Sequence, residues 1–173
     1  HDEISKGTAT KLLVQCRSCG HKVSPEREDL IGWQDADNEI DARDRSAFAC
    51  PNCGVVWSNE DRIEMHKSLS VIHRGQTIAE DGVTIEGDLP KTRTLGFRFN
   101  GFNNLLIKPG DLGIEEWLAA RAVNSENAEK KLCQFFWALP YIPDKTDDIP
   151  LDALTLTTRT SPFRRGLIPP ETL

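Results

Sequence analysis

Two cysteine pairs with the same spacing constrain the fold of this chain more than any other feature. Cys16 and Cys19 form the first CxxC motif, Cys50 and Cys53 form the second, and a glycine follows each motif. A CxxC turn points two sulfurs at one cation, and the glycine permits the positive φ that such a turn often needs. Two turns supply four thiolates, the usual ligands of a tetrahedral structural zinc ion. The sequence therefore predicts a zinc ribbon, in which two hairpins pack side by side with Zn²⁺ between their tips.

Other uses of paired cysteines fit this sequence less well. Two disulfides would need an oxidising compartment, and we find no secretory signal pattern. A redox CxxC motif sits between a strand and a helix of a βαβ unit, and the sequence lacks that pattern. An iron–sulfur cluster stays open as an alternative, although it prefers other spacings. The 30 residues between the pairs exceed the roughly 15–20 of the commonest zinc pattern, but a long insert between hairpin tips accommodates them.

Neither the predicted zinc nor any other motif points to catalysis within this chain. Four thiolates leave no coordination position open, so the zinc would be structural. The sequence contains no GxxxxGK[ST] phosphate loop, GxGxxG fingerprint or GxSxG nucleophile motif. We expect surface or packing roles for His66 and His73, and we expect the isolated Cys133 to be a small buried hydrophobe. We therefore predict no catalytic residue here.

Charge is distributed unevenly along the 173 residues. Residues 1–88 contain 10 Lys and Arg against 17 Asp and Glu, whereas residues 89–173 contain 11 against 10. Binding to a phosphate backbone calls for a basic surface, so the acidic half is a poor candidate overall, although a local basic patch is compatible with it. Arg159, Arg164 and Arg165 form a basic cluster, either in a solvated linker or as a contact for phosphate or an acidic surface.

Hydrophobic periodicity and turn signals predict a small α+β fold. A zinc ribbon of two β-hairpins is followed by a strand, a helical segment and an extended C-terminal connector. No apolar run approaches the roughly 20 residues of a membrane span, so we expect no membrane partner. The predicted segments are a polar lead-in (1–11), the zinc ribbon with a short helix (12–74), a turn-rich linker (75–93), a strand and two-helix segment (94–140), and a proline-rich connector (141–173).

Four further expectations concern individual elements. Ser58 and Asp61 form a helix-start signal. The acidic residues 34–46 indicate a solvated loop. Alternation over 94–100 predicts a strand that buries one face, and helical spacing predicts helices on both sides of residue 124, with a core of their own. The buried side chains expected in these elements are Leu95, Phe97 and Phe99 in the strand, Ile114, Trp117, Leu118 and Ala122 in the first helix, and Ala128, Leu132, Phe135, Phe136 and Leu139 in the second.

Short motifs follow the first cysteine pair in a distinctive order. They are Glu28–Trp33 between the pairs, the second pair itself, Gly96–Asn100, Trp117–Ala119, Leu132–Tyr141 and Arg165–Leu173. In this order the chain resembles the large terminase subunit of tailed bacteriophages, in its lambda-type branch. Two departures are Trp137, where that family often has Asn, and Leu139-Pro140, which lacks the family's glycine.

The resemblance implies that the chain is a segment of a longer protein, between a packaging ATPase domain and a nuclease domain. The whole protein would be an ATPase and a metal-dependent endonuclease that drives viral DNA into a procapsid and cuts concatemers. The residues carried over are Cys16, Cys19, Cys50 and Cys53, as zinc ligands. The implied partners are those two domains, viral double-stranded DNA, the small terminase subunit and the portal, in the cytoplasm of the bacterial host.

A free-standing zinc-ribbon adaptor for nucleic acid or protein is the alternative function. It predicts salt-dependent binding of DNA or RNA through Arg159, Arg164 and Arg165.

Overall fold

The computed structural model of the chain describes residues 6–142. The chain divides into two compact units, His1–Tyr141 and Ile142–Leu173, and all helices and strands of the described residues belong to the first unit. In this described range no helix is long and apolar enough to cross a membrane.

The predicted basic cluster lies outside the described residues, as does almost all of the predicted connector (141–173). A contact through Arg159, Arg164 and Arg165 therefore remains a prediction.

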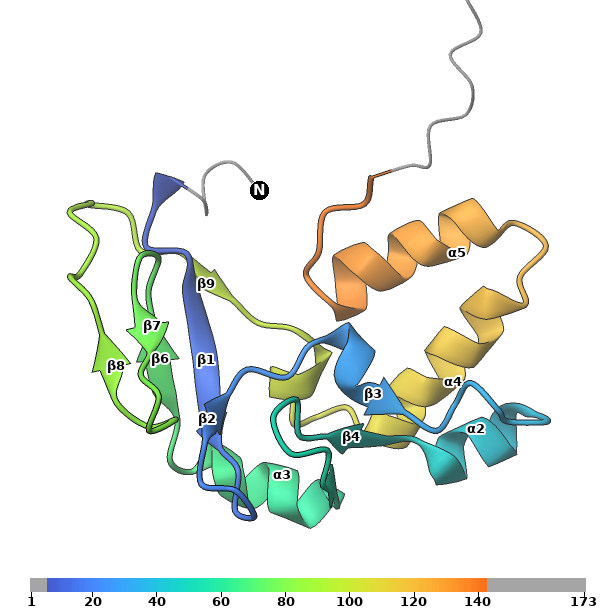
Figure 1. The fold of residues 1–173 in the computed structure, drawn as a ribbon. Helices are drawn as coiled ribbons and strands as arrows, with labels where there is room; N and C mark the ends of the chain where they lie inside the picture. The colour runs from blue at the N-terminus through green and yellow to red at the C-terminus, as the bar shows by residue number, and fades with distance from the viewer. Residues whose placement is uncertain (1–5, 143–173) are drawn as a thin grey trace, which may run out of the picture. The chain divides into compact units, whose positions relative to one another are not determined.

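A four-stranded sheet is built around the longest strand, β1 (Thr10–Gln15). β2 (Lys22–Val23) and β6 (Ser70–Ile72) pair with it in antiparallel fashion, and β9 (Phe97–Arg98) pairs with it in parallel. β9 and β6 lie on opposite sides of β1 (Figure 1). β9 is thus an edge strand of the described sheet.

Two smaller antiparallel sheets complete the β structure. β3 (Leu30–Ile31), β4 (Ala47–Ala49) and β5 (Val56–Trp57) form one, and β7 (Thr77–Ile78) and β8 (Ile85–Glu86) form a hairpin. The cysteine pairs lie in the β1–β2 and β4–β5 connections, so the two predicted hairpins are present.

Within residues 6–142, the same unit contains four α-helices and three short helical turns. The helices are α2 (Glu39–Arg45), α3 (Asn59–His66), α4 (Pro109–Ala120) and α5 (Ser125–Lys131), the 3-10 turns are Arg27–Asp29 and Gly101–Asn103, and a π-helical turn spans Leu132–Phe136.

The predicted start of α3 is confirmed. The Ser58 hydroxyl accepts from the Asp61 N–H at 3.0 Å, and the Asp61 carboxylate accepts from the Ser58 N–H at 3.2 Å. These reciprocal bonds satisfy two donors that the helix itself leaves unpaired.

The solvated loop expected over 34–46 is wrong, because α2 occupies its second half. Asn38 Oδ1 accepts from the N–H groups of Ile40 and Asp41, both at 3.0 Å. Acidic side chains in the first turn interact favourably with the helix dipole, so an Asp-rich composition does not exclude a helix. Ala42 is fully buried, which gives this polar helix a packed side.

The predicted buried face of the 94–100 strand is also wrong. Leu95 is 71% exposed, Phe97 42% and Phe99 62%, and the strand itself is limited to β9. Period-2 alternation places these side chains on one face but does not determine whether another element covers it. No described element covers this face.

Leu132 is buried as expected, but the two later helices otherwise bury a different set of side chains. α4 buries Leu112, Gly113 and Glu116, whereas Leu118 is 40% exposed. After α5, the Trp137 N–H donates to the Leu132 carbonyl at 3.1 Å, which closes the π-helical turn. The wider turn changes the helical phase, so Trp137 is fully buried while Phe135 is 79% exposed.

One hydrophobic cluster joins the cysteine hairpins to these helices, so the expectation of a separate helical core is wrong. Its buried members are Val14, Cys16, Val23, Leu30, Phe48, Cys50, Trp57, Met65, Phe102, Leu112, Leu132 and Trp137. Phe48 contributes edge-on ring contacts to Phe102 at 5.0 Å and to Trp137 at 6.2 Å between centroids.

Candidate metal centre

The two CxxC turns have the same backbone geometry. The Gly20 N–H donates to the Cys16 carbonyl and the Gly54 N–H donates to the Cys50 carbonyl, both at 2.8 Å. The two glycines have φ values of +76° and +73°, in the left-handed region that glycine adopts without strain. The positive φ expected after each motif is therefore confirmed.

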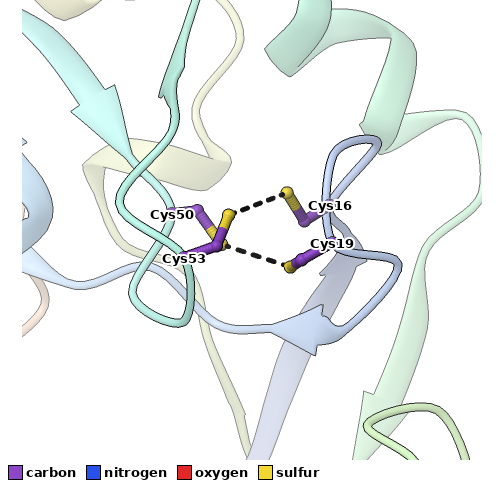
Figure 2. A group of neighbouring side chains, drawn as sticks. All are labelled: Cys16, Cys19, Cys50 and Cys53. Atoms are coloured by element: carbon purple, nitrogen blue, oxygen red, sulfur yellow. Dashed lines mark hydrogen bonds between the residues drawn. The ribbon is translucent and has the colours of Figure 1, made fainter.

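These turns direct four sulfurs into one space (Figure 2). Cys16 Sγ lies 4.0 Å from Cys53 Sγ, Cys19 Sγ lies 3.9 Å from Cys50 Sγ, and all four sulfurs lie within 4.8 Å of one another. A tetrahedral zinc with Zn–S bonds of about 2.3 Å needs sulfurs about 3.8 Å apart. The donor set thus fits a four-thiolate metal ion in chemistry and in size.

The thiols of the site differ in burial and in pKa. Cys16 and Cys50 are buried, Cys19 is half-buried and Cys53 is exposed. The Asn52 amide donates to Cys19 Sγ at 3.5 Å and lowers the pKa of that thiol to about 6, whereas burial raises the pKa of the Cys50 thiol. A divalent cation would have to displace the Cys50 proton, so binding would release protons.

Both candidate histidines make contacts away from the sulfurs. His66 Nδ1 lies 2.7 Å from the Arg62 carbonyl oxygen, and its ring packs on Phe102 with centroids 5.0 Å apart. His73 Nδ1 lies 2.8 Å from Thr10 Oγ1. Within residues 6–142, the convergent group of metal-type ligands consists of the four cysteines alone.

The insert between the cysteine pairs carries Arg27, the centre of a partly buried ionic cluster that sequence reasoning missed. Arg27 donates from Nε and Nη2 to the two carboxylate oxygens of Glu116, both at 2.7 Å, and from Nη2 to Glu129 Oε2 at 2.9 Å. The Trp137 indole N–H donates to Glu116 Oε1 at 2.6 Å. Glu116 is 2% exposed, so its charge is compensated within the protein.

This cluster ties the insert to α4, α5 and the π-helical turn. The Glu129 hydrogen bond raises the pKa of Arg27, and Arg27 in turn lowers the pKa of Glu129. Cys133 is buried as expected, and burial raises the pKa of its thiol. The cysteine turns therefore lie at the two ends of the insert, and the ionic cluster restrains it near its start.

Residues 1–69 match the family model of the phage terminase large subunit gpA, ATPase domain. No curated protein and no solved structure matches the chain. The family match contains both cysteine pairs, and it supports the terminase family and a role in phage DNA packaging. It falls on residues that we expected to follow the ATPase domain, so the predicted placement between ATPase and nuclease stays a prediction.

Proposed function

We propose that this chain is a zinc-stapled structural unit of a phage terminase large subunit. In this role it contributes to DNA packaging by holding parts of the packaging enzyme in a fixed relation, and it performs no catalytic step itself. Its partners would be the ATPase and nuclease domains of the same protein, with viral DNA, the small subunit and the portal as further candidates.

The observation that carries the proposal is the convergence of four thiols from two hairpins within the family match. Cys16, Cys19, Cys50 and Cys53 all lie in residues 1–69, and their sulfurs lie at the separations that zinc requires. When bound, the metal would supply cross-linking of the two turns, with no open position for a substrate. The chain itself positions the ligands: the turns orient the thiolates, and Asn52 donates a hydrogen bond to the Cys19 sulfur.

Metal content tests the zinc part of the proposal. We expect one zinc per chain by elemental analysis of protein purified under reducing conditions. Cys16→Ser should lose it, because a four-ligand structural site tolerates the loss of a ligand poorly. Cys133→Ser is the matched control, since Cys133 lies outside the cluster, and it should retain the metal. A well-folded parent protein without metal would contradict the proposal.

The gene that encodes this sequence tests the packaging part. We expect its reading frame to encode a phosphate-loop ATPase upstream of His1 and an acidic nuclease site downstream of Leu173. A gene without an ATPase upstream would contradict the terminase proposal and leave the metal site standing. The two experiments therefore fail independently.

A further inference from the structure

All four strands of the β1 sheet come from stretches of sequence that contain no Asp or Glu. Residues 4–25 supply β1 and β2, residues 65–79 supply β6, and residues 89–110 supply β9. These three stretches carry 10 Lys and Arg, although the whole chain has a net charge of −6. The fold therefore gathers acid-free segments, distant in sequence, into one sheet with a local positive charge.

One edge of this sheet keeps part of that charge without an ion pair among the described residues. Glu26, which lies outside the acid-free stretches, forms ion pairs with Arg98 at 2.6 Å and with Lys11 at 3.6 Å. Lys91 and Arg93, which precede β9, are exposed and form no ion pair with the described residues. Two free cations thus lie on the segment that leads into the edge strand.

Exposed aromatic rings continue the same segment. Phe97 and Phe99 are 42% and 62% exposed, with ring centroids 6.3 Å apart and planes inclined by 31°. Alternate residues of an extended strand share one face, so Leu95 joins these rings on the same side. Figure 1 shows β9 at the edge of the sheet, beside the start of β1. The segment therefore presents two similarly oriented rings a few residues after its two free cations.

We propose that this edge binds single-stranded nucleic acid. Bases would stack on Phe97 and Phe99, and phosphates would contact Lys91 and Arg93. Aromatic platforms beside a basic groove are the general means by which proteins hold unpaired strands without reading their sequence. The assignment of DNA as the natural ligand rests on the proposed packaging function, whereas the binding chemistry rests on the described surface.

Charge complementarity favours a polyanion over a second copy of the chain. Two copies that met at this edge would each present the same positively charged segment, and like charges across an interface are unfavourable. Duplex DNA keeps its bases stacked inside, so it would engage the cations but not the rings. An unpaired strand uses both features of the edge.

Fluorescence anisotropy with labelled oligothymidine tests the stacking contact on the whole chain. We expect Phe97→Ala/Phe99→Ala to weaken binding by about tenfold or more, the range that loss of base stacking gives. Phe135→Ala is the matched control, because it removes another exposed phenylalanine from a different element, and it should bind as the parent does. Circular dichroism of each variant checks that the fold is retained.

The salt dependence of the same binding tests the phosphate contacts. Lys91→Ala/Arg93→Ala should reduce the slope of log K against log salt by about 1.4, as expected for two cations on a single strand. Lys130→Ala/Lys131→Ala removes the same charge from α5 and should leave the slope unchanged.

Three results would overturn the inference. They are equal affinity of the phenylalanine double variant and its control, equal affinity for duplex and single strand, and loss of self-association in the double variant without any strand binding. None of them bears on zinc content or on the flanking reading frame, so failure here is distinct from failure of the proposed function.

Discussion

The cysteine hairpins and the helices packed beside them belong to one core, but different interactions hold them. The strands that follow the two cysteine turns, β2 and β5, have only two residues each, so the ladders that they form contribute few hydrogen bonds. The helices rely on close backbone approach between α2 and α4 and on the Arg27 cluster. We therefore expect the hairpins to depend on metal and the helices to depend on packing and buried charge.

The comparison also shows how the two regions depend on each other. The insert that begins after the first cysteine turn carries Arg27, and it ends at β4, which leads into the second turn. The insert is fixed by the cysteine turns at its ends and by carboxylates near its start. Because both regions share one core, loss of either restraint should also destabilise the region that the other restraint holds.

Removal of the metal should have the largest effect on this comparison. Structural zinc contributes roughly 10–16 kcal/mol of apparent binding free energy in small zinc-finger peptides, and that free energy is folding free energy. Since Cys16 and Cys50 belong to the same cluster as Leu132 and Trp137, we expect a strong chelator to reduce the helical circular dichroism signal together with zinc release. Titration with chelator, followed by both signals, measures this.

Restoring zinc should recover both signals, which distinguishes folding from chemical damage. If the helical signal survives complete zinc removal, the helices possess an independent core and the single-core description fails.

The convergence of the four cysteines was predictable, because local spacing defines each CxxC turn. Each CxxC turn is complete within five residues, and the Ser58–Asp61 cap is complete within four, so no distant partner is needed to recognise them. The Arg27–Glu129 contact, in contrast, joins residues 102 positions apart, so no local sequence pattern predicts it.

Burial of individual side chains was harder to predict, because it depends on what covers them. Arg62 is 1% exposed and donates to the Ile107 carbonyl at 2.6 Å, although a charged residue in a short polar helix is ordinarily placed in solvent. Phe97 and Phe99 are the opposite case: their alternation is typical of a buried strand face, but both side chains are exposed. Periodicity gives the shared face, and only the tertiary fold decides its surroundings.

Loss of the Arg27 side chain should have the next largest effect. Arg27→Ala leaves Glu116 buried with the Trp137 indole as its remaining donor, and breaking a buried pair in this way costs about 3–5 kcal/mol. Urea unfolding of the zinc-loaded protein, compared at equal m values, measures the loss.

Two variants sharpen this measurement. Arg45→Ala removes a half-exposed arginine that pairs with Asp41 one turn away on α2, and it should cost only about 0.3–0.5 kcal/mol. Arg27→Met combined with Glu116→Leu should cost less than Arg27→Ala alone, because no buried charge is left unpaired. If Arg27→Ala and Arg45→Ala cost the same, the cluster does not stabilise the helical region.

Substitution of Gly113 should have a smaller effect than loss of the Arg27 side chain, and it tests the packing of α4 on α2. A Cβ built at Gly113 would overlap the Ser46 hydroxyl, which donates to the Ala42 carbonyl at 2.5 Å. Gly113→Ala should therefore destabilise the protein by about 1–3 kcal/mol through overpacking, even though alanine in a helix interior is intrinsically favoured over glycine by about 1 kcal/mol. Adding Ser46→Gly makes room for the new methyl group and should recover part of the loss in urea unfolding. A stabilised Gly113→Ala protein would mean that helix propensity outweighs the close approach of α2, and that the two helices are packed less tightly than the residues at their contact indicate.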